Sequence, residues 1–510
     1  MPRRLLIYSA WFGIALLASA LRLHDLSDRP IHADEATGAR ILANRLADKT
    51  YQFDPQHFHG PLLSLVAIPI AKARHESSWA ELTPFTLRLG PVIAGCLLTL
   101  TPLLWVRRLG TAAALAAASL LATSPLLVYY NRIYIHETLL TLLAMLGFAA
   151  LYQLVTKPTR LIGILAGLST GLMFATKETA AISLLSWCVA LIAIILRKYS
   201  TTSSSHSLAP NSRDYLAPIT LFTLTAALTA SYFYSNGFTS PSGIIDALRT
   251  YFVYETTAGH EKPFTYYAQL MLWPKHNLGM WWSEATIALL AITAVATTFL
   301  KRSQTNPIPF ITIATIAHLS IYSFIDYKTP WLMMVPWTHA CLLAGCAFGS
   351  IQKRSPATRV TLVTFLLVGL AYQTQQSILA SGRFENDPRN PYAYVPTSQD
   401  MQSLPAWLDA LASTSSQTPA TLSPIAVVGS EYWPLPWYLR NFETIGYWPT
   451  PIPEMQTFQI VFALPAQTDP THALLQDTHT QLPRSLRANV PIMLYLRNDL
   501  WNQWIDDSPQ

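Results

Sequence analysis

The feature that most constrains this chain is a succession of apolar stretches, most of them long enough to cross a lipid bilayer. The hydrocarbon core of a bilayer takes about 20 predominantly apolar residues per helix. The segments that meet or approach this length run roughly over residues 5–23, 85–106, 111–130, 137–156, 161–176, 179–196, 216–234, 284–300, 308–325, 330–349 and 358–377. We therefore expect a polytopic α-helical membrane protein with about eleven transmembrane helices.

Composition agrees with this expectation. Hydrophobic residues make up 51% of the 510 residues, and charged residues only 12%. The net charge of +6 comes from small basic clusters between apolar stretches, so nucleic acid is not an expected partner. All four cysteines lie inside apolar stretches, which argues against a disulfide framework and against a thiolate zinc site.

Basic pairs fall at every second connection between the apolar segments, and the positive-inside rule makes these connections cytoplasmic. The pairs are Arg3 and Arg4, Arg107 and Arg108, Lys157 and Arg160, Arg197 and Lys198, Lys301 and Arg302, and Lys353 and Arg354. The first apolar segment lacks a convincing cleavage site, so we expect it to remain as a helix. The apolar stretch around residues 60–72 contains two prolines and is too short to cross, and crossing there would invert the charge pattern.

Two domains follow from this topology. We expect a transmembrane domain over residues 1–378, with outer loops at about 24–84 and 235–283, and a non-cytoplasmic α/β domain over residues 379–510. The tail alternates a helix-like piece, MQSLPAWLDALAS, with strand-like runs, PIAVVGS, FQIVFALP and PIMLYLRN. Residues 200–212 predict a flexible cytoplasmic loop. The protein is expected in the inner or plasma membrane of the cell.

Adjacent carboxylates follow the first apolar segment in the sequence HADEA, which contains Asp34 and Glu35. In a pocket at the membrane surface such a pair could act as a general base with an orienting partner. The alternative is a helix N-terminus, with Asp34 as the cap and Glu35 favoured by the helix dipole.

Several cations lie on the outer side, where the charge rule does not expect them. Arg132 stands near His136 and Glu137 in YYNRIYIHETLL, while Lys177 and Lys328 lie at outer helix ends. Cations against a membrane need partners, and a lipid phosphate is a suitable one. The alternatives are snorkelling of Arg132, and pairing of the lysines with the nearby carboxylates Glu178 and Asp326.

Histidines are dense in the first outer loop and beside Glu137. His57, His59 and His136 could hold a divalent metal, since imidazole is a suitable ligand. The spacing matches no established zinc pattern, and a His-x-His in a loop is usually incidental. The sequence therefore does not require a metal or any other cofactor.

The ordered set of these motifs resembles the GT-C glycosyltransferases. The set comprises the acidic pair, RRLG, ATSPLLVYYNRIYIHETLLTLLAML and a TKE at a later outer turn. It is most similar to the dolichyl-phosphate-mannose protein mannosyltransferases and the bacterial aminoarabinose lipid A transferases. HGPLL, GHEKPFTYY, YKTPWL and WPLPWYLR resemble a prokaryotic branch labelled flippase-associated membrane protein.

The resemblance implies a role for each motif residue. Asp34 would be the general base, Glu35 its orienting partner and Glu137 a second acidic residue of the site. Arg132, Lys177 and Lys328 would bind the donor phosphate. This chain has His59-Gly60-Pro61 where the lipid A transferases have Lys-Pro-Pro, and it has glutamate at the second acidic position. The contact of that lysine with phosphate would therefore fall to His59.

The leading hypothesis is transfer of a sugar from a polyprenyl-phosphate donor to a protein or lipid acceptor at the outer membrane face. A multi-spanning transporter or lipid flippase is the main alternative, because intramembrane charges also suit transport. A catalytically inactive scaffold whose tail binds partners is a third. Carriers with inverted repeats show paired broken helices in two matching halves, and we find no such pattern here.

Overall fold

The computed structural model describes residues 3–47, 51–201, 212–254, 259–299, 307–349, 351–414, 422 and 424–507. The chain forms two compact units. The helical unit comprises Met1–Leu26, Lys49–Ile70 and Arg88–Phe384, and the sheet unit comprises Ser27–Asp48, Ala71–Leu87 and Glu385–Gln510. Most of the predicted loop 200–212 and the basic pair Lys301 and Arg302 lie outside the described residues.

Helices dominate the chain before Glu385. They are α1 (Arg3–Leu23), α2 (Ala33–Leu46), α3 (Leu62–Ala73), α4 (Pro84–Leu100), η1 (Thr101–Trp105), α5 (Val106–Leu109), α6 (Thr111–Thr123), α7 (Pro125–Tyr130), α8 (His136–Thr156), α9 (Arg160–Thr176), α10 (Ala180–Thr201), α11 (Ser212–Tyr234), α12 (Ser242–Val253), α13 (Tyr266–Met271), α14 (Ala285–Phe299), α15 (Ile308–Phe324), η2 (Pro330–Met333), α16 (Met334–Gly345), η3 (Cys346–Phe348), η4 (Ile351–Lys353) and α17 (Pro356–Ala380). A short hairpin, β1 (Lys275–Asn277) and β2 (Met280–Trp282), follows α13.

Among the described residues, 6 helical stretches are long and apolar enough to cross a membrane. They are Arg4–Leu23, Pro84–Leu109, His136–Thr156, Arg213–Tyr234, Pro330–Lys353 and Pro356–Ala380. Each predicted apolar segment coincides with one helix or with consecutive helices, so the polytopic helical fold is confirmed. The exact number of membrane crossings stays a prediction.

The outward surfaces of several helices are apolar, as lipid contact requires. In the most apolar 18-residue stretches of α1 and α11, only 6% of the residues are buried inside the protein, although the mean hydropathy of these stretches is high. Phe12 and Leu216, for example, are 71% and 72% exposed. A water-soluble protein would bury such side chains, because each apolar square ångström removed from water is favourable.

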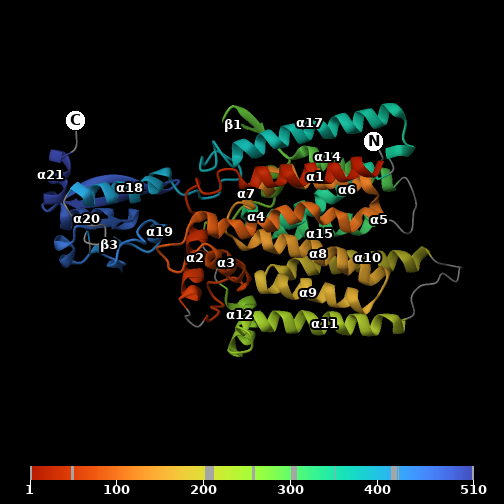
Figure 1. Ribbon diagram of the computed structural model, residues 1–510, viewed down its shortest axis with the longest axis horizontal. Helices are drawn as coiled ribbons and strands as arrows, with labels where there is room; N and C mark the ends of the chain where they lie inside the picture. Colours follow the sequence, from red (N-terminus) through yellow and green to blue (C-terminus); the bar gives the residue numbers. More distant parts are fainter. Residues whose placement is uncertain are drawn as a thin grey trace. The chain divides into compact units, whose positions relative to one another are not determined.

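Glycines let α9 pack closely on α11, which lies beside it in Figure 1. Gly163, Gly167 and Gly171 follow one another at every fourth position along α9. A Cβ atom at these glycines would lie 2.2, 2.4 and 2.6 Å from backbone carbonyl oxygens of α11. Helices in membranes associate largely through such close backbone approach, so this stripe fixes the α9–α11 pair.

The sheet unit contains a five-stranded sheet in the order β4-β3-β5-β7-β6. Strands β4, β3 and β5 are parallel, and β7 and β6 continue the sheet antiparallel to their neighbours. The strands are β3 (Ile425–Val428), β4 (Ile445–Trp448), β5 (Ile460–Ala463), β6 (His479–Arg487) and β7 (Val490–Arg497). The surrounding helices are α18 (Gln399–Thr414), α19 (Leu435–Tyr438), η6 (Pro453–Thr457), η7 (Pro465–Gln467), α20 (Thr468–Leu475) and α21 (Asn498–Asp507), and Figure 1 shows them around the sheet.

Every residue of β3 and β5 is buried, so these strands are covered on both faces. One face packs Val428, Val461 and Tyr495 against Met455 and Leu475. Continuous apolar runs are typical of parallel strands that are buried on both sides. The predicted α/β character of the C-terminal region is therefore confirmed. The segments Ser27–Asp48, which contains α2, and Ala71–Leu87 also contribute to this unit.

Candidate active site

A buried ion pair joins the start of α8 to the end of α9 in the helical unit. The Lys177 Nζ donates to Glu137 Oε1 at 2.5 Å, and the side chains are 7% and 6% exposed. Glu137 lies in the first turn of α8, where the helix dipole favours a negative charge. Burial by itself would lower the pKa of Lys177, but the charges of Glu137 and Glu178 outweigh burial and raise it. The two carboxylates therefore favour the charged form of Lys177.

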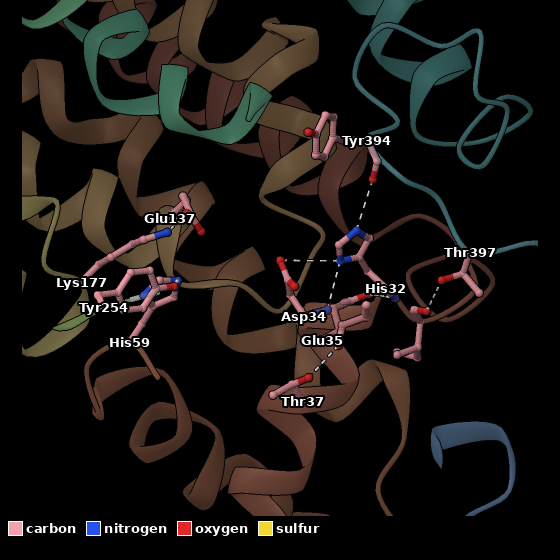
Figure 2. Close-up of polar contacts among 12 residues, drawn as sticks. His32, Asp34, Glu35, Thr37, His59, Glu137, Lys177, Tyr254, Tyr394 and Thr397 are labelled. Carbon is pink, nitrogen blue, oxygen red and sulfur yellow. Dashed lines mark hydrogen bonds and ion pairs between the residues drawn. The ribbon is translucent and has the colours of Figure 1, made fainter. Parts of the chain in front are cut away.

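His59 lies beside this pair and forms its own polar contacts. Its Nδ1 is 3.0 Å from Glu178 Oε2, and its Nε2 is 3.5 Å from the Tyr254 hydroxyl. The rings of His59 and Tyr254 stack with their centroids 5.4 Å apart. Burial would raise the pKa of Glu178, but His59 and Lys177 lower it to about 2. The ionised Glu178 carboxylate can therefore accept a hydrogen bond from His59 Nδ1–H. Figure 2 shows His59, Tyr254, Lys177 and Glu137 grouped together.

The backbone beside His59 is held against the end of α9. A Cβ atom at Gly60 would lie 2.3 Å from the carbonyl oxygen of Ala175, so a larger residue would not fit. The Gly60 carbonyl lies 3.2 Å from His136 Nε2, and the rings of His59 and His136 meet edge to face. His59, His136 and Lys177 therefore come together from three separate segments. We call His59, His136, Glu137, Lys177, Glu178 and Tyr254 the histidine–lysine cluster.

Arg132 follows α7 in the sequence, and its side chain reaches the C-terminal end of α1. Its guanidinium donates to the carbonyl oxygens of Leu21, Arg22, His24, Asp25 and Ser381. The last carbonyls of a helix have no partner within the helix, and a cation there is favourable. The side chain is 4% exposed. These contacts make Arg132 a cap for the C-terminal end of α1.

Lys328 is also buried, at 1% exposure. Its ammonium donates to the carbonyl oxygens of Lys262, at 2.9 Å, and of Ile325. Its own N–H donates to the His260 carbonyl at 2.9 Å. These contacts tie the turn after α15 to the segment around His260. They involve backbone carbonyls rather than the carboxylate of Asp326, which was the sequence-based alternative.

Asp34 lies in the sheet unit, in the first turn of α2. The cap of this helix is His32, so the alternative in which Asp34 is the cap is wrong. The Asp34 N–H donates to His32 Nδ1 at 3.2 Å, and the His32 N–H donates to Glu35 Oε2 at 3.0 Å. Glu35 is fully buried, whereas the Asp34 side chain is 54% exposed. Of the two adjacent carboxylates, Asp34 is therefore the one open to a substrate, and Glu35 completes the cap.

The histidines that the sequence suggested as metal ligands have other partners. His57 Nδ1 lies 2.9 Å from Asp54 Oδ2, and His59 contacts Glu178 and Tyr254. Among the residues that the structure describes, no group of three or more His, Cys, Asp or Glu side chains could hold a metal ion. A metal role for His57, His59 and His136 stays a prediction and is not needed by these contacts.

Sequence reasoning missed two members of the cluster. Tyr254 lies in an aromatic-rich loop, YFVYET, where nothing distinguishes it from its neighbours. Glu178 was considered only as a partner for Lys177. The TKE triplet could have indicated that Glu178 has a partner of its own, because adjacent residues at a helix end point in different directions.

Part of the chain matches a known protein family. Residues 80–209 match the family model described as dolichyl-phosphate-mannose-protein mannosyltransferase. This stretch contains Arg132, Glu137 and Lys177. No curated protein matches the chain in sequence.

Solved structures match over nearly the whole chain. The apo structure of ArnT from Cupriavidus metallidurans covers 98% of this chain and 98% of its own, with a TM-score of 0.64 and 13% identity. AglB from Archaeoglobus fulgidus, an oligosaccharyltransferase in complex with an inhibitory peptide and a dolichol-phosphate, covers 98% of this chain and 77% of its own, with a TM-score of 0.53 and 13% identity. The chain has the GT-C fold.

A third GT-C structure extends this likeness. The arabinofuranosyltransferase AftD from Mycobacteria covers 98% of this chain, with a TM-score of 0.51 and 13% identity, although the match spans only 40% of AftD. The resemblance to GT-C glycosyltransferases that the sequence motifs suggested is therefore confirmed at the level of the fold. The long apolar helices and the apolar surfaces of α1 and α11 indicate that this chain is a membrane protein.

Proposed function

We propose that the protein transfers a sugar from a polyprenyl-phosphate donor to a hydroxyl of a protein or lipid acceptor. The reaction would take place at the non-cytoplasmic face of the inner or plasma membrane. Asp34 is the general base, and Lys177 with His59 binds the phosphate of the donor.

One observation carries the proposal. ArnT bound to undecaprenyl phosphate matches 99% of this chain with a TM-score of 0.62, at 12% identity. The family model and the structural relatives describe glycosyltransferases, which supports glycosyl transfer over the transport alternative.

The exposure of Asp34 supports its role as the base. A general base must reach the acceptor proton within hydrogen-bond distance or through one water, and the Asp34 side chain is 54% exposed. In the proposed step Asp34 takes the proton of the acceptor hydroxyl. The acceptor oxygen bonds to the anomeric carbon as the bond from that carbon to the phosphate oxygen breaks, with inversion. Polyprenyl phosphate leaves with the electron pair of the broken bond.

The histidine–lysine cluster in the helical unit supports binding of the donor phosphate. Lys177 stays positively charged because the pKa of its ammonium is raised, and a point charge of this kind stabilises the negative charge of a departing phosphate. His59, at 23% exposure, and the Tyr254 hydroxyl offer further polar contacts. Glu137 would orient the Lys177 ammonium through their 2.5 Å contact rather than act on the substrate itself.

Arg132, Lys328 and Glu35 hold the backbone in place in this proposal and do not contact the substrate. Arg132 and Lys328 donate to backbone carbonyls, and Glu35 accepts from the backbone of His32. Replacing these contacts with a phosphate or a substrate would leave buried backbone groups without partners, which is costly.

The proposed side of the membrane follows from the two ends of α8 and α9. Glu137 and Lys177 lie at one end of this helix pair, while Lys157 and Arg160 flank the connection at the other end. With 21 residues, α8 is about 30 Å long, which is the thickness of the hydrocarbon core. If Lys157 and Arg160 face the cytoplasm, the histidine–lysine cluster faces the opposite side.

The test separates donor binding from catalysis with the purified protein in nanodiscs. Turnover is measured with a panel of undecaprenyl-phosphate hexoses and pentoses on membrane extract, and binding with undecaprenyl phosphate alone. Asp34→Asn should lower kcat by about a hundredfold to ten-thousandfold while leaving the Kd for undecaprenyl phosphate unchanged, because a general base acts in the transition state. Lys177→Met should instead raise that Kd by about tenfold or more, because a charge-assisted hydrogen bond is lost.

Two further variants make this test specific. Asp25→Asn, at a carboxylate that is 62% exposed and outside the proposed site, should behave like the wild type. Lys177→Met leaves Glu137 as a buried unpaired charge, so the double variant Lys177→Met with Glu137→Gln tests binding without that defect. A folded Asp34→Asn protein that transfers sugar at the wild-type rate would remove the mechanism.

A further inference from the structure

The loop that leads into α2 is bound by side chains from the C-terminal part of the sheet unit. The Ile31 N–H donates to the Tyr438 hydroxyl at 2.9 Å, and the Thr397 hydroxyl donates to the Ile31 carbonyl at 2.7 Å. Both backbone polar groups of Ile31 are therefore hydrogen-bonded by side chains that lie more than three hundred positions away in the sequence. Ile31 is 1% exposed and Thr397 is 2% exposed, so water does not compete for these bonds.

The hydrogen bonds continue from Ile31 to Asp34. His32, the cap of α2, lies 3.2 Å through Nε2 from the Tyr394 carbonyl, and its Nδ1 accepts from the Asp34 N–H. Because Nδ1 accepts, Nε2 carries the proton and donates to Tyr394 in this arrangement. Figure 2 shows His32 between Tyr394 and Asp34, with Thr397 on the other side of the same loop.

Further contacts join this loop and the segment Ala71–Leu87 to the C-terminal part of the sheet unit. Gln402, in α18, donates to the carbonyl of Asp28, and Arg440 donates to the carbonyl of Ala80. Trp79 meets Trp437 edge to face, with ring centroids 5.5 Å apart. The segments Ser27–Asp48 and Ala71–Leu87 thus pack with the C-terminal region, and all three belong to the sheet unit.

We propose that Tyr438 and Thr397 are positioning residues that fix the Ile31 peptide and thereby aim the Asp34 carboxylate at the acceptor. This inference rests on the proposed function, in which Asp34 is the general base. It gives the C-terminal region a part in positioning the general base. It also gives a role to Tyr438 in the motif WPLPWYLR, which the sequence analysis singled out without assigning one.

The geometry explains why two distant hydroxyls matter for a carboxylate that they do not touch. The Asp34 side chain is 54% exposed, and its carboxylate Oδ2 lies 3.8 Å from Nδ1 of His32, the cap of the same helix. Its place is set by the backbone of the first turn of α2, and that turn begins at His32. A reacting group displaced by about 1 Å loses up to about a hundredfold in rate.

The test compares variants that remove one hydroxyl each. Tyr438→Phe and Thr397→Val should lower kcat by about tenfold to a hundredfold, with KM for donor and acceptor changed by less than about twofold, because substrate binding is untouched. Thr397→Ser keeps the hydroxyl and should restore kcat to within about threefold of the wild type. A merely structural role would not give this split between kcat and KM together with rescue by serine.

The matched controls are hydroxyls of the same unit that bind elsewhere. The Tyr495 hydroxyl donates to the Thr468 carbonyl at 3.2 Å, and the Thr468 hydroxyl donates to the Leu464 carbonyl at 3.2 Å. Tyr495→Phe and Thr468→Val should therefore keep the wild-type kcat. If Tyr438→Phe fails to fold, the Thr397→Val and Thr397→Ser pair carries the test alone.

Two results would overturn the inference. One is a wild-type kcat in both Tyr438→Phe and Thr397→Val. The other is an equal loss of kcat in Tyr495→Phe, which would mean general weakening of the domain. Asp34→Asn separates this failure from failure of the proposed function. If Asp34→Asn is inactive while Tyr438→Phe and Thr397→Val are fully active, only the positioning role is wrong. If Asp34→Asn is active, the proposed function is wrong.

Discussion

At the scale of single residues, Lys177 and Glu178 illustrate how neighbours in the sequence serve different partners. Lys177 follows α9 and binds Glu137 of α8, while Glu178 binds His59, which precedes α3. Adjacent residues at a helix end point in different directions, so they do not satisfy each other directly. The two opposite charges therefore connect three segments of the helical unit, which are α8, α9 and the segment around His59.

Glu178 gives a prediction that depends on pH. The pKa of Glu178 is lowered from 4.5 to about 2 in the folded protein, so the ionised carboxylate stabilises the fold. This contribution is on the order of 3 kcal/mol, is fully present above about pH 4.5 and is lost as the pH falls from there towards 2. Glu178→Gln should thus lower the thermal unfolding temperature near neutral pH, and the difference from the wild type should shrink in acid.

The measurement is thermal unfolding in detergent at intervals between pH 3 and pH 7. Glu454→Gln, at an exposed glutamate of η6, is the matched control and should unfold like the wild type throughout. A difference between Glu178→Gln and wild type that stays constant down to pH 3 would show that the carboxylate is not stabilised by its neighbours.

At the scale of elements, the segment that carries His59 depends on the absence of a side chain at Gly60. A methyl group there would lie 2.3 Å from the Ala175 carbonyl, at the end of α9. We expect Gly60→Ala to push the segment away from α9, to cost about 1–3 kcal/mol of stability and to weaken binding of undecaprenyl phosphate through displacement of His59. Thermal unfolding and lipid binding, measured on the same preparation, check both effects.

The control for this prediction is Gly13→Ala. A methyl group at Gly13, in α1, would have no neighbour within 4 Å, so this variant should match the wild type in both measurements. If Gly60→Ala bound undecaprenyl phosphate as tightly as the wild type, the segment around His59 would have no part in the donor site.

The elements themselves were predictable to different degrees. Apolar length alone located the membrane helices, because a bilayer demands it of every spanning segment. Strands β3, β5 and β7 were also predictable from their apolar runs. The edge strands β4 and β6 were missed, since β6 carries Pro483 and several polar residues, and edge strands tolerate both. The glycine stripe of α9 was missed because its meaning depends on the neighbouring helix.

At the scale of the whole molecule, the sequence indicated which residues are chemically unusual but not what they touch. Arg132 and Lys328 were singled out as cations that need partners, and both are buried. Their partners are backbone carbonyls, which every residue has, so no sequence signal identifies them. Likewise, Tyr438 and Ile31 are far apart in the chain, and only the fold shows that they form a hydrogen bond.

The proposed reaction places one demand on the whole molecule, which is that Asp34 and the histidine–lysine cluster face the same compartment. The test uses single cysteines, in a background with the four native cysteines replaced, and a membrane-impermeant maleimide on intact cells. Arg249→Cys, on α12, and Glu454→Cys, in the sheet unit, replace exposed residues and should react from outside. Gln352→Cys, beside the basic pair Lys353 and Arg354, should react only after the membrane is permeabilised. Labelling of positions 249 and 454 from opposite sides would mean that the base and the donor phosphate cannot meet in one reaction.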